Sequence, residues 1–199
     1  GFGPTYGPIQ RKLGFTHFNG ESWFTAMNDP LNSFPDLVDV ALDPTDKNKV
    51  FISGFGDTQS INTYNTGGLF EVQNNEITNF YNNLNSPLAD IVENIANRVT
   101  IRVSGSVFGT QGNLWVANIG VSNELKKFSN GSWTEFDISA GKPENSFGLS
   151  DIVVDINNTV WIGTRDDGII AFNENGNRIR GLTTTATQGS LPNLNVFSL

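Results

Sequence analysis

The sequence has no cysteine and only one histidine. Without cysteine the chain can form no disulfide, no thiolate metal site and no cysteine nucleophile. The single histidine, His17, excludes a metal site with several histidine ligands and leaves one position around which a Ser-His-Asp arrangement could form. No apolar run approaches the ~18 residues that a membrane-spanning helix needs. We therefore expect a chain that does not span a membrane.

Charged residues are also scarce, at 16% of the chain, and 20 acidic against 12 basic residues give a formal net charge of −8. An excess of negative charge disfavours nonspecific contact with phosphate backbones, so no nucleic acid partner is expected. The abundant residues include 21 Gly and 15 Phe, together with 4 Trp. This composition is typical of many short strands joined by tight turns.

Two features recur at intervals of about 45 residues, which indicates a repeat architecture. One is a polar turn rich in asparagine, and the other is an apolar triplet with a central aromatic residue. Longer intervals are explained by insertions at residues 57–67 and 85–99, because loops accept extra residues at small entropic cost. The turns begin at Asn19, Asn74, Asn130 and Asn175, and the triplets are centred on Phe51, Trp115 and Trp161.

Each repeat predicts four short strands with alternating apolar residues, as at Ile152 and Val154. Such sheets bury both faces by radial stacking, so the predicted fold is all-β, a β-propeller of four-stranded antiparallel blades. Propellers typically close with about four to eight blades, and the chain therefore predicts an incomplete arc or a fragment of a larger propeller. The predicted parts are the outer half of a blade at 14–26, whole blades at 37–81, 100–138 and 149–182, and the start of a next blade at 193–199.

Residues 147–168 resemble the two-component-regulator propeller repeat, in which an apolar strand is followed by Asp, a turn, Leu-Trp-Ile-Gly-Thr and Gly-Leu. Asp155 and Trp161 stand at the Asp and Trp of that pattern. The preceding repeat is a looser copy, with Gly109 at the Asp position before Trp115. Glycine cannot bond its own turn backbone as aspartate does, so we expect a less firmly held turn there.

Residues 1–7 and 14–23 resemble the PorZ-type proteins of the type IX secretion system of Bacteroidetes, and this resemblance covers nearly the whole chain. It implies a secreted, noncatalytic β-propeller binding module at the cell surface, on the extracellular face of the outer membrane or in the periplasm. That family assists attachment of secreted cargo to anionic lipopolysaccharide. The repeat family implies an alternative, a ligand-sensing periplasmic ectodomain of a hybrid two-component histidine kinase.

No catalytic, metal or cofactor site is predicted. His17 has no orienting partner nearby in the sequence and fits an ordinary strand residue. The oxygen-rich segment 43–48 lacks the spacing of a calcium loop and fits a β-turn. A polysaccharide lyase or hydrolase is disfavoured because no acid and base pair emerges. The tryptophans Trp23, Trp115, Trp133 and Trp161 recur in the repeat and are predicted to belong to the core between blades.

The insertions are better candidates for recognition, because the repeat does not require them. Four residues are predicted to bind a ligand: Tyr64 in the first insertion, Arg98 and Arg102 around the end of the second, and Arg165 in a turn of the third whole blade. The predicted partner is an anionic polysaccharide or a protein at the cell surface. Because antiparallel strands alternate in direction, both insertions are expected to project from one face of the propeller.

Overall fold

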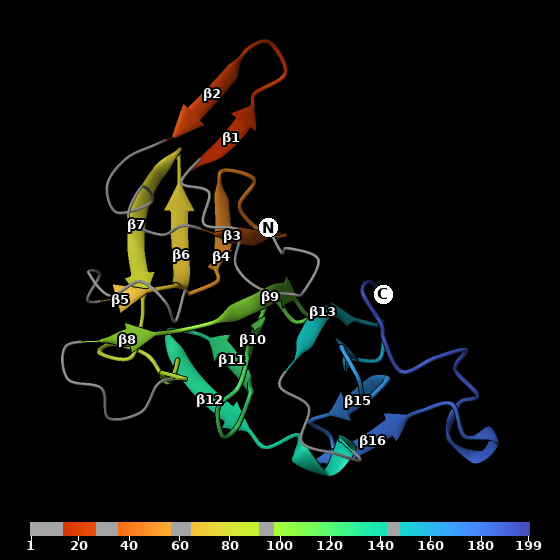
Figure 1. The fold of residues 1–199 in the computed structure, drawn as a ribbon. Coiled ribbons are helices and arrows are strands. Elements are labelled where there is room, and N and C mark those ends of the chain that lie inside the picture. Colours follow the sequence, from red (N-terminus) through yellow and green to blue (C-terminus); the bar gives the residue numbers. More distant parts are fainter. Residues whose placement is uncertain (1–13, 27–35, 57–64, 92–97, 143–147) are drawn as a thin grey trace. The chain divides into compact units, whose positions relative to one another are not determined.

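A computed structural model describes residues 14–26, 36–56, 65–91, 98–142 and 148–199 (Figure 1). Within these residues all elements are β-strands except two short 3-10 helices, Ser139–Gly141 and Ala186–Gln188, and no described helix is long and apolar enough to cross a membrane. The chain divides into two compact units, Gly1–Val103 and Ser104–Leu199. The all-β class and the four-stranded antiparallel sheets predicted from the repeat are confirmed.

The first unit contains a two-stranded hairpin and a four-stranded sheet. In the hairpin, Asn19 holds the turn, because its Oδ1 accepts hydrogen bonds of 2.9 Å from the backbone N–H groups of Glu21 and Ser22. In the sheet, the last turn uses Asn74 and Asn75, both with positive φ. The hairpin pairs β1 (Phe15–Phe18) with β2 (Trp23–Ala26), and the sheet runs in the order β3 (Leu37–Leu42), β4 (Lys49–Gly54), β6 (Gly68–Gln73), β7 (Glu76–Tyr81).

Alternation along these strands places an apolar cluster on one face of the four-stranded sheet. Ile52, Phe70 and Val72 form its buried cluster, and the rings of Phe70 and Phe80 stack with centroids 4.7 Å apart. Phe15 of β1 packs against this cluster. The hairpin therefore covers part of the apolar face, as the outer half of a preceding blade would.

The opposite face of the same sheet carries a charged cluster. Glu71 is buried, forms an ion pair of 2.6 Å with Lys49 and accepts a hydrogen bond of 2.8 Å from Tyr81 Oη. Burial acts to raise the pKa of Glu71, but the hydrogen bonds from Lys49, Tyr81 and Asn79 outweigh it and hold the pKa below its ordinary value. The carboxylate is thus a structural anion rather than a proton donor.

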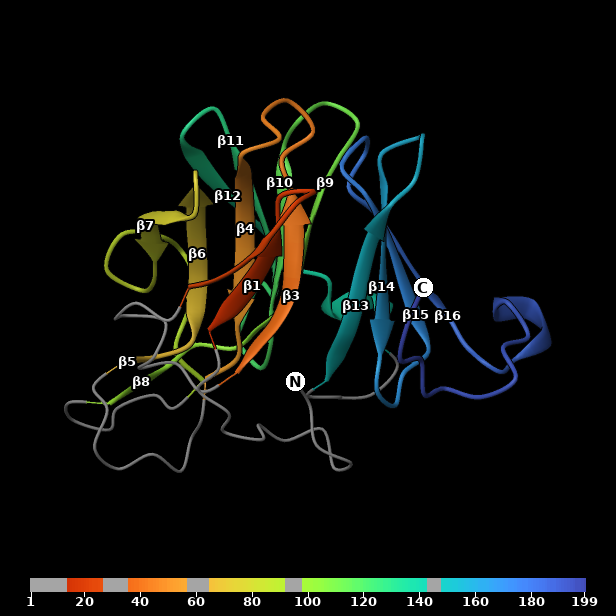
Figure 2. The same ribbon diagram turned by 90° about the horizontal axis from the view of Figure 1, so that it is seen from above.

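The second unit contains two four-stranded antiparallel sheets (Figure 2). In each, consecutive strands are neighbours, and tight turns with asparagine at positive φ join several of them. One sheet consists of β9 (Val103–Phe108), β10 (Leu114–Asn118), β11 (Leu125–Ser129) and β12 (Ser132–Phe136), and the other of β13 (Leu149–Val154), β14 (Thr159–Thr164), β15 (Ile169–Asn173) and β16 (Arg178–Leu182).

The two sheets of the second unit pack face to face through an aromatic contact. Trp115 on β10 is 1% exposed, and its ring lies 5.9 Å from that of Phe172 on β15. At the rim, the side-chain Oδ1 of Asn158 accepts hydrogen bonds from the backbone N–H (3.2 Å) and hydroxyl (2.5 Å) of Thr110. Lys127 forms an ion pair with Glu174. Neighbouring blades are therefore joined by an apolar centre and a polar rim.

The tryptophans differ in burial, and the prediction that all four lie in the core is wrong. Trp115 is buried as predicted, whereas Trp23 is 70% exposed. Trp161 stands at the position equivalent to Trp115 but is partly exposed, because no further sheet among the described residues of the second unit covers that face of β14. Trp133 is also partly exposed. Trp23 and Trp133 instead occupy equivalent outer-strand positions, each 4.9 Å from a phenylalanine ring.

The C-terminal segment 193–199 contains no strand. Its backbone hydrogen bonds to the β13–β16 sheet, from Gly168 N–H to Leu194 O (2.8 Å) and from Val196 N–H to Thr164 O (2.9 Å). Leu199 N–H donates to the Asp151 carboxylate at 2.9 Å. That this segment begins another blade stays a prediction.

The turn that precedes the central tryptophan differs between the two sheets of the second unit. Asp155 Oδ1 accepts from the backbone N–H groups of Asn157 and Thr159, and its Oδ2 accepts from Trp161 Nε1 at 3.0 Å. Gly109 stands at the equivalent position, since Gly109 N–H donates to Asn113 O as Asp155 N–H does to Thr159 O. In this part of the described chain, the buried Nε1 of Trp115 and Oδ1 of Asn113 have no hydrogen-bond partner.

We predict that Gly109→Asp combined with Asn113→Thr, which copies the Asp155 turn, raises the free energy of unfolding by about 0.5 to 1.5 kcal/mol at neutral pH. The new carboxylate would accept from Trp115 Nε1, and the second change removes Asn113 Oδ1, which lies 2.4 Å from the Cβ position at residue 109. Urea unfolding of the variant and the parent chain measures the difference. No gain in stability would contradict the prediction.

The pH dependence of this gain follows from Asp155. Hydrogen bonds, first from Trp161 and then from the backbone of Thr159, lower the pKa of Asp155 below its ordinary value. A group with a lowered folded pKa stabilises above its unfolded pKa, and the effect is lost as pH falls through the folded value. The gain at residue 109 should therefore disappear below about pH 4. A Gly109→Asn, Asn113→Thr control should lack this loss, because an amide does not titrate.

Candidate functional site

The two insertions meet at one end of the β3–β4–β6–β7 sheet. β5 (Asn65–Thr66) closes the first insertion and pairs in parallel with β8 (Val99–Thr100), which closes the second. Asn65 lies opposite Val99, and Thr66 lies opposite Thr100. Figures 1 and 2 both show β5 and β8 side by side. The described ends of the two insertions thus lie together, whereas the face from which the insertions project stays a prediction. We call β5, β8 and the residues that fix them the insertion junction.

Close backbone packing holds the insertion junction together. Gly56 N–H donates to Ile101 O at 2.9 Å. Gly67 has a φ of +78°, and a Cβ at that residue would lie 1.8 Å from Ile101 O and 2.5 Å from Gly56 N. Only glycine combines this backbone conformation with this approach. Sequence reasoning treated Gly67 as the boundary of an insertion and missed this role.

Asp90 fixes β8 from its other side. Its Oδ1 accepts a hydrogen bond of 2.8 Å from Thr100 N–H, and Ile91 N–H donates to Thr100 O at 3.0 Å. Thr100 is fully buried. The second insertion is thus tied down at both of its described ends.

Arg102 is part of the frame of the insertion junction. Its Nε donates a hydrogen bond of 3.0 Å to Gly56 O, and its guanidinium lies 4.8 Å from the centre of the Phe55 ring. Arg102 also pairs with Phe55 as an isolated antiparallel bridge. These contacts use much of the Arg102 side chain to join the residues that follow β8 to the residues that follow β4.

Arg98 differs from Arg102 although only four positions separate them. Its Nε and Nη2 atoms are buried and have no hydrogen-bond partner among the residues that the structure describes. Buried donors without partners are rare in folded proteins, because each loses its hydration without compensation. A guanidinium of this kind, one residue before β8, favours an acceptor with negative charge.

The other predicted site residues are not gathered at the insertion junction by the described structure. Tyr64 lies outside the described residues. Arg165 belongs to the second unit, in the β14–β15 connection that corresponds to the β4–β6 connection of the first unit. Its backbone N–H donates to Gly148 O at 2.9 Å, and the neighbouring Asp167 is 2% exposed.

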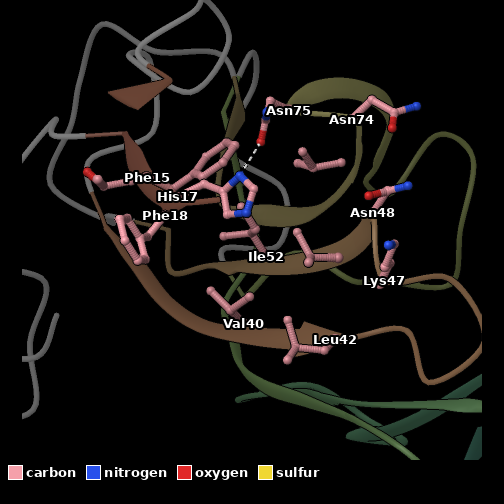
Figure 3. Close-up of a pocket in the computed structure, with 13 residues that line it drawn as sticks. Phe15, His17, Phe18, Val40, Leu42, Lys47, Asn48, Ile52, Asn74 and Asn75 are labelled. Atoms are coloured by element: carbon pink, nitrogen blue, oxygen red, sulfur yellow. Dashed lines mark hydrogen bonds between the residues drawn. The ribbon is translucent and has the colours of Figure 1, made fainter. Parts of the chain in front are cut away.

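Within the part of the chain that the structure describes, no acid and base pair is assembled around His17. Its Nδ1 lies 2.8 Å from Asn75 Oδ1 (Figure 3), so its partner is an amide rather than a carboxylate. Asp43 Oδ1 accepts from the backbone N–H and the hydroxyl of Thr45, as expected of a turn residue. Across the described ranges, no group of three or more His, Cys, Asp or Glu side chains could hold a metal ion.

No family model and no curated protein matches the chain. PorZ, described as an essential bacterial surface component of the type IX secretion system of Porphyromonas gingivalis, has 20% identity and a TM-score of 0.56 over 71% of this chain and 18% of PorZ. An extracellular domain from B. thetaiotaomicron, ascribed to a hybrid two-component system, has 17% identity and a TM-score of 0.51 over 81% of this chain and 18% of that one.

These two structures come from the two groups that the sequence resembles, and the resemblance is confirmed at the level of the fold. The chain has the β-propeller architecture. It spans less than a fifth of the length of either solved chain.

Proposed function

We propose that this chain is a noncatalytic binding module of a protein at the cell surface or in the periplasm, and that its insertion junction binds an anionic polysaccharide. The observation that carries the proposal is the half-buried Arg98 side chain, whose buried Nε and Nη2 atoms lack partners among the described residues. A sulfate, phosphate or carboxylate group would supply the missing acceptors through charge-assisted hydrogen bonds. Asp90 and Gly67 hold β8 and β5 in place, so the arginine is presented from a rigid base.

The net charge of the chain constrains how such a ligand is recognised. A formal charge of −8 repels a polyanion at long range. Binding therefore depends on short-range contacts, with Arg98 at the centre and Tyr64 and Arg102 as further proposed contacts at the insertion junction. Arg165 is proposed as a separate contact in the second unit. We expect modest affinity that strengthens when the chain carries fewer negative charges, and weakens when Arg98 is removed.

Replacing Arg98 by alanine tests the site. With purified anionic lipopolysaccharide as the probe, we expect at least about a tenfold loss of affinity, since a charge-assisted hydrogen bond contributes about 1.5 to 3 kcal/mol. Arg178→Ala is the matched control, because Arg178 is exposed on β16, far along the chain from the insertion junction. Neutral dextran should bind neither variant nor the parent chain.

Equal affinity of the Arg98→Ala variant and the parent chain would reject the polysaccharide site. Capture of a surface protein that is lost in the same variant, with no lipopolysaccharide binding, would show that the partner is a protein. Turnover of a glycan panel by the parent chain would reject the noncatalytic assignment.

For the whole protein we propose a PorZ-like component of type IX secretion, which assists attachment of secreted cargo to anionic lipopolysaccharide at the extracellular face of the outer membrane. The alternative is the ligand-sensing ectodomain of a hybrid histidine kinase. Likeness of the fold supports the two equally. The sequence of the full gene would distinguish the two. A sorting domain downstream favours the first, and a transmembrane helix with a kinase domain favours the second.

A further inference from the structure

The connection between β14 and β15 buries a carboxylate that lacks a partner. Asp167 is 2% exposed, and its Oδ2 has no hydrogen-bond partner among the residues that the structure describes. Burial removes the hydration of a carboxylate, and the cost is large unless a cation or several donors replace the water. The burial of Asp167 therefore calls for a partner that the described chain does not supply.

The backbone of this turn is held firmly around Asp167. Asp167 N–H donates to Thr164 Oγ1 at 2.8 Å, and Thr164 Oγ1 donates to Gly168 O at 2.9 Å. Gly168 N–H donates to Leu194 O at 2.8 Å, which ties the turn to the C-terminal segment. The backbone thus fixes the position of the carboxylate, and a ligand would meet a preorganised group.

The basic side chains of the second unit do not neutralise Asp167. Arg165 supplies no hydrogen bond to the buried oxygen. Arg178 and Arg180 lie farther along β16, because Leu182 stands opposite Ile169 at the end of β15 nearest the turn. Each lysine of the unit forms an ion pair with a glutamate: Lys126 with Glu135, Lys127 with Glu174, and Lys142 with Glu124.

The other sheet of the second unit shows how a similar acid is satisfied. Glu124 stands near the end of the β10–β11 connection, as Asp167 does in the β14–β15 connection, and is also buried. Its partner is Lys142, from the segment that follows β12. The segment that follows β16, residues 183–199, contains no charged side chain. A lysine ammonium is therefore present beside one acid and missing beside the other.

We propose that Asp167 binds an alkylammonium group from outside the chain. A Cβ at Gly168 would lie 2.1 Å from Leu182 O and 3.1 Å from Leu191 Cδ1, so the site is narrow. A compact ammonium on a flexible stem fits such a site better than a planar guanidinium does. The adjacent Asp166 is exposed, so the carboxylate lies directly below the surface.

Two further observations favour a monovalent organic cation. No group of three or more His, Cys, Asp or Glu side chains gathers in the described ranges, so a divalent metal ion would find few ligands at Asp167. The formal net charge of −8 attracts cations at long range. The inference concerns a ligand of opposite charge to the one proposed at Arg98 and does not depend on it.

Replacing Asp167 by asparagine removes the charge and keeps the shape of the side chain. Binding of spermidine, and of a short peptide with one lysine, is measured by calorimetry at low salt. We expect Asp167→Asn to weaken binding at least about tenfold, because a charge-assisted hydrogen bond is lost. Asp166→Asn is the matched control, because it removes the same charge from the exposed neighbour, and it should change affinity less than about twofold.

The two probes distinguish the source of the ammonium group. Binding of spermidine that depends on Asp167 supports a free polyamine, and binding of the peptide alone supports a lysine side chain of a partner protein. Without either probe, Asp167→Asn should unfold at a higher urea concentration than the parent chain, because a neutral amide replaces a buried charge. A lower urea midpoint would overturn the proposal, since it would show that the carboxylate is already satisfied.

A second variant tests the site without removing Asp167. Leu191→Lys places an ammonium of the chain itself beside the turn, and it should abolish binding of both probes, whereas Leu191→Met should retain it. Equal affinity of Asp167→Asn and the parent chain, or no binding of either probe, would overturn the proposal. Equal weakening by Asp166→Asn would also overturn it. Arg98→Ala should leave binding of both probes unchanged, so a failure of one site is distinguished from a failure of the other.

Discussion

Replacing Trp115 by alanine is expected to lower the free energy of unfolding by about 3 to 5 kcal/mol, the range for a large aromatic residue removed from a core. The indole is 1% exposed, and its ring centroid lies 5.4 Å from that of Phe136 and 5.9 Å from that of Phe172. Its removal would leave a cavity between two sheets that the surrounding strands cannot close. Urea or guanidinium unfolding of the parent chain and the variant measures the loss. The transition is followed by far-ultraviolet circular dichroism, because the tryptophan fluorescence itself changes with the substitution.

The matched control is Trp23→Ala. Trp23 is 70% exposed and contacts mainly the ring of Phe18, at 4.9 Å. We expect it to cost less than about 1 kcal/mol, as an exposed aromatic pair contributes little beyond its own contact. Similar losses for the two variants would show that Trp115 is not the centre of the packing between blades. Trp161→Ala should fall between them, because Trp161 is only partly buried.

Replacing Gly67 by alanine is expected to destabilise the first unit by about 2 to 5 kcal/mol. About 1 to 2 kcal/mol comes from placing a Cβ in a left-handed conformation, and about 1 to 3 kcal/mol from overpacking. The second effect arises because the new Cβ would stand 1.8 Å from Ile101 O. Relief requires β5 and β8 to separate, so hydrogen exchange at Thr66 and Thr100 should accelerate together.

Gly131→Ala separates the two causes. Gly131 has a φ of +76°, nearly that of Gly67, but no atom lies within 4 Å of its Cβ position. It should therefore show only the conformational cost of about 1 to 2 kcal/mol. If Gly67→Ala costs no more than Gly131→Ala, the backbones of the two insertions do not pack as closely as the structure describes, and the rigid base proposed for Arg98 is lost.

Local features of the sequence were enough to predict the blades. Tight antiparallel hairpins need residues that accept a positive φ, and Asn74, Asn130 and the following residues supply them. Alternating apolar residues then place Ile52 or Ile162 inward within each strand. Both signals depend on only a few neighbouring residues, so they can be recognised without knowledge of the rest of the fold.

The candidate site was only partly predictable. Strand direction was enough to bring the closing strands of the two insertions, β5 and β8, to the same end of the sheet. It could not show that Arg102 is engaged by Gly56 O and the Phe55 ring, whereas Arg98 keeps two buried donors without partners among the described residues. Two arginines four positions apart look alike in a sequence. Their difference arises from neighbours that are more than 40 residues away for Arg102.

The sequence by itself determined the repeat, the turn positions and the alternation of each strand, because these depend on backbone conformation and on the two-residue period of a strand. Tertiary structure decided which equivalent residues are buried. Trp115 and Trp161, or Ile152 and Val40, occupy matching positions, yet one of each pair is covered and the other is more exposed. A blade face is buried only by the sheet that stacks on it, so burial depends on a neighbour and not on the residue itself.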